Sequence, residues 1–111
     1  MFKDFTEMPV WQKAMEIAVE CFFLSERLPR KEDYGLTSQL RRSAESILAY
    51  IAEAFGRRSN KDKNRVYDIS RSEAFETKNH LDLLMRVQSK YSLWIESQKQ
   101  RPQIQPFFVS C

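Results

Sequence analysis

Apolar residues recur at three- and four-residue steps through most of the first ninety positions, which is the period of an amphipathic helix. A first helix is predicted between Pro9 and Pro29, because Pro9 suits a first helical position and Pro29 disfavours helix in the residue before it. Its main apolar face comprises Trp11, Ala14, Met15, Ala18, Phe22 and Leu28, and a second stripe comprises Val10, Ile17 and Leu24. The two stripes exceed one helix face, so the segment predicts apolar surface that a lone chain does not cover.

A second helix is predicted from near Thr37, whose hydroxyl is a candidate cap for free backbone amides. Its apolar positions are Leu40, Ala44, Ile47, Leu48, Ile51, Ala54 and Phe55. Gly56 follows the last of them, which is typical of a left-handed cap at a helix C-terminus. Ser59 and Asp62 then approximate the capping box that opens a further helix.

The third helix is predicted to run from about Asn60 to about Ser89. Its expected inner side comprises Tyr67, Ala74, Leu81, Leu84 and Met85, with Ser70 and Thr77 between them. The pattern weakens beyond Lys90. Residues 91–99 are compatible with two helical turns, and the two prolines in residues 100–111 favour an extended or irregular tail, packed through Phe107 and Phe108.

The 111 residues are enough for one domain, 1–111, with an N-terminal arm at 1–8 and a weakly patterned segment at 91–111. Two glycines are too few for the turns of a sheet protein, so the predicted fold class is all-α. Three long helices with short connections predict an antiparallel up-and-down bundle, in which a short or irregular C-terminal segment replaces a full fourth helix.

No apolar run approaches the ~20 residues of a membrane span, and the N-terminus lacks the basic and apolar regions of a secretory signal. We therefore expect a cytoplasmic protein that does not enter a membrane. Cys21 and Cys111 do not form a disulfide framework. Cys21 is predicted to be a small core residue and Cys111 an exposed free thiol.

Candidate chemistry is sparse. His80 is the single histidine, and it is expected to be a surface or half-buried polar residue. No zinc-ligand spacing and no glycine-rich phosphate loop occur, and Ser38, Ser43 and Ser46 have no obvious base beside them. We expect no enzymatic activity, no cofactor and no metal.

Glu53 and Glu76 are the carboxylates predicted to point inward. A buried charge without a partner is costly, so they are expected to pair with each other or with Arg41 or Arg42. A general acid–base pair is the functional alternative, although no pattern in the sequence requires one.

Positive charge gathers after the second helix. The net charge of the whole chain is only +3, whereas residues 57–71 hold six basic and two acidic side chains. One interpretation is structural, since basic residues favour a helix C-terminus and keep an exposed face soluble. The other is contact with phosphates. Arg41 and Arg42 lie about four helical turns earlier, roughly 22 Å along the axis, and would form a separate basic site in a monomer.

Three segments of the chain, "VWQKAMEIA" at 10–18, "GLTSQLRRSAESILAYIAEAFGRRS" at 35–59 and "ISRSEAFETKNHL" at 69–81, occur in order and resemble the four helix bundle protein family, also called the 23S rRNA intervening-sequence protein family. The resemblance covers roughly residues 2 to 90. It implies a bacterial, antiparallel four-helix bundle that forms a homo-oligomer, commonly a pentamer. Related accessory proteins of diversity-generating retroelements are thought to bind nucleic acid and a reverse transcriptase. No enzymatic activity is established for the family.

This chain departs from the family pattern at several positions. Leu48 stands where the family often has proline, and Glu73 adds bulk and charge where a neighbouring helix is expected to approach. The long fourth helix is missing. Either a short helix and tail cover the exposed groove, or a neighbouring subunit does, or the reading frame is altered.

Two functions are compatible with these features. The first is an oligomeric bundle that binds RNA or DNA, and the predicted nucleic-acid-binding residues are Arg41, Arg42, Arg57, Arg58, Lys61, Lys63 and Arg65. The alternative is a scaffold or accessory subunit, which recruits a protein partner through the apolar face of the first helix.

Overall fold

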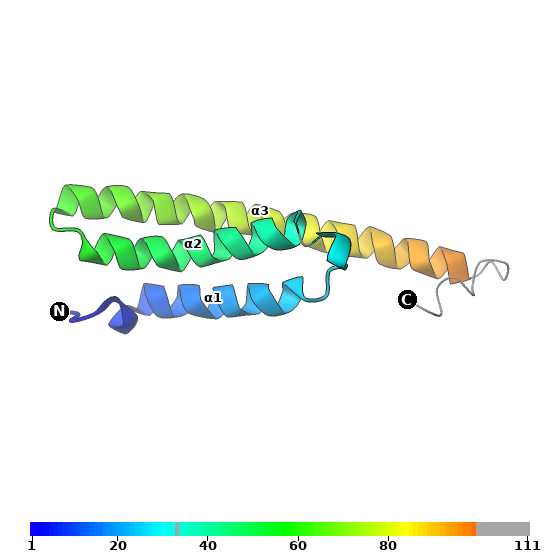
Figure 1. Cartoon of the computed structure of the whole chain (residues 1–111), viewed down its shortest axis with the longest axis horizontal. Coiled ribbons are helices and arrows are strands. Elements are labelled where there is room, and N and C mark those ends of the chain that lie inside the picture. Colours follow the sequence, from blue (N-terminus) through cyan, green and yellow to red (C-terminus); the bar gives the residue numbers. More distant parts are fainter. Residues whose placement is uncertain (33, 100–111) are drawn as a thin grey trace. The chain divides into compact units, whose positions relative to one another are not determined.

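The structure is a computed structural model that describes residues 1–32 and 34–99 (Figure 1). Its elements in chain order are η1 (Phe5–Glu7), α1 (Pro9–Ser25), η2 (Arg30–Glu32), α2 (Leu36–Gly56) and α3 (Asn60–Lys99). The described residues contain helices and no strand, which confirms the predicted all-α class. The chain divides into two compact units, which are Met1–His80 and Leu81–Cys111.

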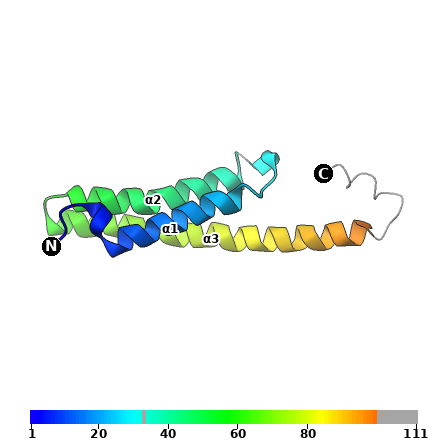
Figure 2. The ribbon, with the colours of Figure 1, turned by 90° about the horizontal axis from the view of Figure 1, so that it is seen from below.

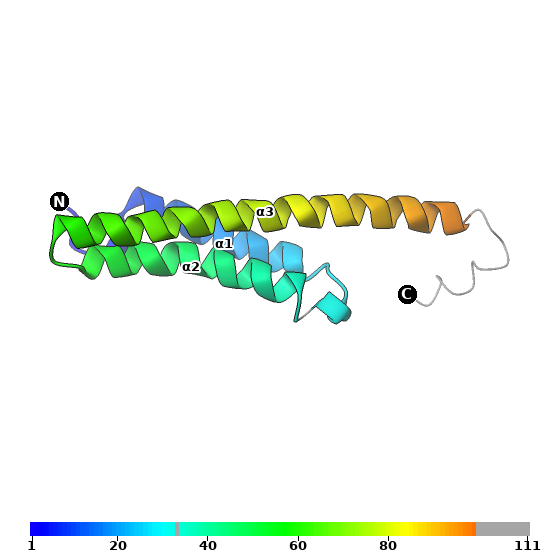
Figure 3. The ribbon, with the colours of Figure 1, turned by 90° about the horizontal axis from the view of Figure 1, so that it is seen from above.

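Within Met1–His80, α1, α2 and the first half of α3 lie side by side. The chain reverses direction at each connection, so α2 runs antiparallel to both neighbours (Figures 1, 2 and 3). This confirms the predicted up-and-down order of three helices. Phe5 of η1 packs its ring 5.4 Å from that of Trp11, and Met8 packs against the core cluster of Ala14, Ile47 and Ile51. The predicted N-terminal arm is therefore part of this unit.

Small residues form the buried stripe of α1. Its fully buried positions are Ala14, Ala18, Cys21 and Ser25. The predicted face was wrong for Met15 and Phe22, which are exposed. Close packing of α1 against α2 selects side chains with little volume, so the large apolar residues lie beside the contact. Cys21 is a core residue, as predicted, and burial raises the pKa of its thiol.

The buried face of α2 matches the prediction at Leu40, Ala44, Ile47, Ile51 and Ala54, and Ser43 is buried with them. Both ends of α2 lie within one residue of the prediction, but neither predicted cap forms. The helix starts before Thr37, whose Oγ1 is buried and has no hydrogen-bond partner, so it does not cap the helix. Gly56 is the last residue of α2 and has no positive φ. An extended Arg57 ends the helix instead, with φ −74° and ψ 150°.

Hydroxyl groups join α2 to α3. Ser70 Oγ donates to the Ile47 carbonyl at 2.7 Å, and the Thr77 hydroxyl donates to Ser43 Oγ at 2.9 Å. These bonds are buried and directional, so they stabilise one register of the two helices. The buried side of α3 follows Val66, Ser70, Thr77 and Leu84. Ala74 and Met85, predicted to face inward, are exposed, because the interior stripe runs through the small polar residues rather than beside them.

The third helix begins at Asn60 as predicted, and Ser59 Oγ accepts from the Asp62 amide at 3.1 Å. The helix continues to Lys99, ten residues beyond the predicted end, and includes the segment 91–99. The predicted irregular tail, its packing through Phe107 and Phe108, and the thiol of Cys111 lie outside the described residues.

Candidate nucleic-acid interface

The turn between α2 and α3 is short and closely held by backbone bonds. The Arg57 amide donates to the Ala54 carbonyl at 3.1 Å, and the Lys63 amide donates to the Ser59 carbonyl at 2.9 Å. Only residues 57–59 lie between the two helices. The turn therefore holds its basic side chains in a small region at one end of both helices.

Two of these side chains bind α2 itself. Arg57 Nη2 lies 2.5 Å from Glu53 Oε1, one helical turn earlier. Lys63 Nζ donates to the Phe55 carbonyl at 2.7 Å and lies 3.4 Å from the Ala54 carbonyl, with its ammonium 5.6 Å from the centre of the Phe55 ring. A cation at this position satisfies the Phe55 carbonyl near the end of the helix and offsets the negative end of the helix dipole.

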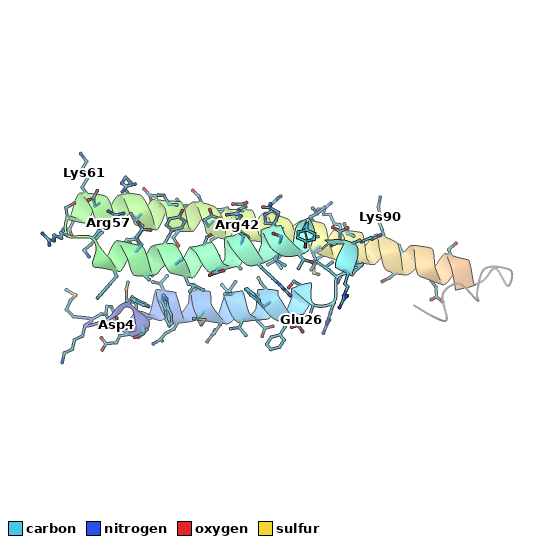
Figure 4. The ribbon with its side chains drawn as sticks, in the orientation of Figure 1. Asp4, Glu26, Arg42, Arg57, Lys61 and Lys90 are labelled. Carbon is cyan, nitrogen blue, oxygen red and sulfur yellow. The ribbon has the colours of Figure 1, made fainter. Side chains whose placement is uncertain are left out.

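The other basic residues of the turn face solvent. Arg65 Nε lies 3.8 Å from Asp62 Oδ1, and both side chains are more than half exposed, so this pair contributes little to stability. Arg58 and Lys61 are exposed, and within residues 1–32 and 34–99 neither side chain makes a hydrogen bond or an ion pair. Figure 4 shows Lys61 pointing away from the helices. The first turn of α3 adds the positive end of its dipole.

Arg41 joins α2 to α1. Its Nε donates to Ser25 Oγ at 2.7 Å, and its guanidinium lies 5.1 Å from the centre of the Phe22 ring. Ser25 is buried and in turn donates to the Phe22 carbonyl at 2.8 Å. The side chain is thus ordered by a hydrogen bond and a cation–π contact, each within the three-helix unit.

Arg42 joins α2 to α3. Its Nη2 is hydrogen-bonded to Glu76 Oε1, and its Nη1 lies 3.5 Å from Glu73 Oε2. His80 Nε2 lies 3.4 Å from Glu76 Oε1. We call Arg42, Glu73, Glu76 and His80 the Arg42 cluster. The predicted pairing of Glu76 with Arg42 is confirmed, whereas Glu53 pairs with Arg57 and with neither predicted arginine.

The two carboxyls of the Arg42 cluster differ in their electrostatics. The hydrogen bond from Arg42 holds the pKa of Glu76 below its usual value. Burial, together with the neighbouring Glu76, raises the pKa of Glu73. Glu73 Oε2 is buried without a hydrogen-bond partner, so its contact with Arg42 does not offset its loss of solvation.

The predicted basic residues therefore fall into two groups. Residues 57–65 come together at the α2–α3 turn, while Arg41 and Arg42 lie about 22 Å away along α2 and contact α1 and α3. The nucleic-acid-binding role of all seven residues stays a prediction. The contact of Lys63 with the end of α2 was not foreseen, whereas Glu73 lies beside a neighbouring helix as expected, and only its contact with Arg42 was not foreseen. Two features of the sequence could have indicated these contacts. Lys63 follows soon after the end of the second helix, and Glu73 lies about one turn before Glu76.

Two of the residues considered for catalysis, Ser43 and His80, lie in packing contacts. Ser43 is buried and bonded to Thr77, and half-buried His80 lies in the Arg42 cluster. No group of three or more His, Cys, Asp or Glu side chains suited to a metal ion occurs among residues 1–32 and 34–99. Across that same part of the chain, no helix combines the length and the apolar character needed to span a bilayer.

The family model described as "23S rRNA-intervening sequence protein" matches residues 6–100, which is most of the chain. The chain belongs to this family. The match confirms the resemblance of the three sequence segments described above, and it extends through the described part of α3. No curated protein matches the chain significantly.

Proposed function

We propose that this family member is a non-enzymatic, oligomeric, cytoplasmic bundle protein that binds RNA or DNA through phosphate contacts at its α2–α3 turn. The observation that supports this proposal is the pair Arg58 and Lys61. Both are exposed, and no described side chain neutralises either of them. Charges that are already paired must lose a partner before they bind a phosphate, whereas these two do not.

The surroundings of the pair favour a polyanion. Lys63 offsets the negative end of the α2 dipole, so that end does not repel a phosphate approaching the turn. Arg57 and Arg65 add positive charge within the same few residues, although each has an acidic neighbour. Exposed point charges of this kind contact the nucleic-acid backbone rather than base edges, so we expect binding that tolerates any sequence.

Assembly would strengthen such binding. A site with about four phosphate contacts is weak at physiological salt, because most of its free energy comes from counterion release. Several copies of the turn on one particle would bind one nucleic acid with a higher effective concentration. The proposed oligomer therefore matters for affinity as well as for stability.

The test is a salt titration of binding to a labelled RNA and to duplex DNA. With about four phosphates neutralised, log K is expected to fall with a slope of roughly −3 to −4 against log salt. The variant Arg58→Ser with Lys61→Ser is expected to weaken binding to every sequence alike, and to reduce the steepness of the slope by about 2.

The matched control is Lys31→Ser with Lys78→Ser. It removes the same charge from two exposed lysines outside the turn and is expected to bind nearly as the unchanged protein does. If the unchanged protein is not retained on RNA or DNA at low salt, the proposal fails. If the control weakens binding as much as the turn variant does, the turn is not the site.

The alternative, a scaffold without nucleic-acid binding, draws on a different observation. Val19, Phe22 and Phe23 on α1 are at least 40% exposed, and such a patch is typical of a protein interaction site. Recovery of one protein partner from cells after nuclease treatment, with the turn variant recovered equally well, would favour this function.

A further inference from the structure

An apolar groove runs along α1 and α2 within the unit Met1–His80. It has a volume of about 430 Å³ and is lined mainly by Met15, Val19, Phe22, Phe23 and Leu48. The charged side chains that line it are Glu26 and Glu45, and both are acidic. Neither carboxylate makes an ion pair with a described residue. The groove thus combines an apolar floor with unpaired negative charge.

A helix face with the opposite character occurs in the later part of α3. Leu83 and Val87 are about half exposed, and together with Arg86 and Lys90 they line one shallow surface. Their spacing of three, four and seven residues places them on one face of the helix. Between Leu83 and Leu93 these two cations are the only charged residues in the sequence. We call these four residues the Leu83 face.

Charge complementarity identifies the occupant of the groove. Two grooves packed against each other would bring four carboxylates together, which disfavours a symmetric groove-to-groove contact. The Leu83 face offers two apolar side chains for the floor and two cations for Glu26 and Glu45. In Figure 4, Glu26 lies at the end of α1 and Lys90 extends outward from α3.

We infer that the groove of one copy binds the Leu83 face of a second copy, so that each chain contributes one surface of each kind. A contact between two different surfaces repeats from copy to copy, and it produces a closed ring or an extended chain. This goes beyond the proposed function, because the contact needs no nucleic acid and involves none of the residues of the α2–α3 turn.

The test uses two charge-reversed full-length proteins, Glu26→Arg with Glu45→Arg, and Arg86→Glu with Lys90→Glu. Light scattering without nucleic acid should show the unchanged protein as a multimer. Each reversed protein alone should associate at least about ten-fold more weakly, since like charges then face each other. An equimolar mixture should recover the multimer, because each groove again meets a face of opposite charge.

Matched controls separate this contact from loss of folding. Leu83→Ser with Val87→Ser should disperse the multimer, whereas Met85→Ser should not, because Met85 is 64% exposed and lies about half a turn away from that face. Far-ultraviolet circular dichroism should show unchanged helix content in every variant. Lys78→Glu with Asp68→Lys, both exposed, should leave the mass unchanged.

Several results would overturn the inference. In the first, the unchanged protein has the mass of a single copy at every concentration. In the second, the Arg86→Glu, Lys90→Glu protein associates as strongly as the unchanged protein. In the third, the equimolar mixture of the two reversed proteins does not form the multimer. Nucleic-acid retention by the dispersed variants would leave the proposed function standing. Loss of retention by the turn variant, with the multimer intact, would leave this contact standing.

Discussion

The tripeptide Arg-Arg-Ser occurs twice in this chain, at 41–43 within α2 and at 57–59 in the α2–α3 turn. In the first copy, Arg41 and Arg42 bind neighbouring helices and Ser43 is buried. In the second copy, Arg57 pairs within its own helix, Arg58 is exposed, and Ser59 caps α3. The same three residues therefore serve packing in one place and an exposed surface in the other. Their position in the fold, rather than their identity, decides which arginine is available to a ligand.

The largest expected effect on stability comes from a substitution in the first copy, at residues 41–43. Arg42→Ala leaves the partly buried carboxyl of Glu73 without a cation and removes the hydrogen bond to Glu76. We expect the free energy of unfolding to fall by about 1 to 2 kcal/mol. Urea unfolding at fixed protein concentration would measure the change, and Arg58→Ala is the control, expected within about 0.5 kcal/mol of the unchanged protein. Equal losses in the free energy of unfolding for Arg42→Ala and Arg58→Ala would contradict this difference between the two copies.

A smaller loss is expected just after the second copy, where Lys63 of α3 contacts the end of α2. Lys63→Met removes the ammonium that binds the Phe55 carbonyl, and should lower the free energy of unfolding by about 0.5 to 1 kcal/mol. Lys61→Met, two residues earlier, removes an exposed ammonium that has no described partner and should change stability by less than about 0.5 kcal/mol. A thermal melt of both variants would distinguish a structural lysine from an exposed one.

Substitution of Gly56 is expected to raise the free energy of unfolding by a similar or smaller amount. Its φ is not positive, and an added Cβ would meet no atom within 4 Å. Alanine restricts the unfolded chain more than glycine does, so Gly56→Ala should stabilise the protein by about 0.5 kcal/mol. A loss of stability would show that the turn needs the left-handed backbone that the sequence predicted there.

The smallest net effect is expected from pH, because the two carboxyls of the Arg42 cluster oppose each other. Glu73 has a raised pKa, so stability should increase as pH falls through that pKa towards the value of the unfolded chain. Glu76 has a lowered pKa, so its contribution is present above the unfolded value and is lost as pH falls further. Melts from pH 7 to pH 3 should show a shallow maximum in weak acid. Glu73→Gln should remove the rise in stability on the neutral side of this maximum and keep the loss of stability on its acid side.

Much of the helix content followed from local sequence. Pro9 begins α1, and Ser59 caps α3 just after a short turn, because both signals act within a few residues. The apolar positions of α2 were also predicted, since the period of the helix places them on one side. The two ends of α2 were predicted to within a residue, but their caps were not. Thr37 and Gly56 have residue types that suit caps, yet the Thr37 hydroxyl has no hydrogen-bond partner and an extended Arg57 follows Gly56.

The sequence by itself determined that this chain forms helices, where most of them begin, and that positive charge collects after the second one. Only the tertiary structure decided which side of α1 is buried, which arginines are paired, and that Arg58 and Lys61 are not. The physical reason is the distance along the sequence over which each kind of interaction acts. Helix period and capping depend on neighbours within about one turn. The partners that Arg41, Arg42 and Thr77 find on neighbouring helices lie at least sixteen residues away in the sequence and meet them only when the helices pack.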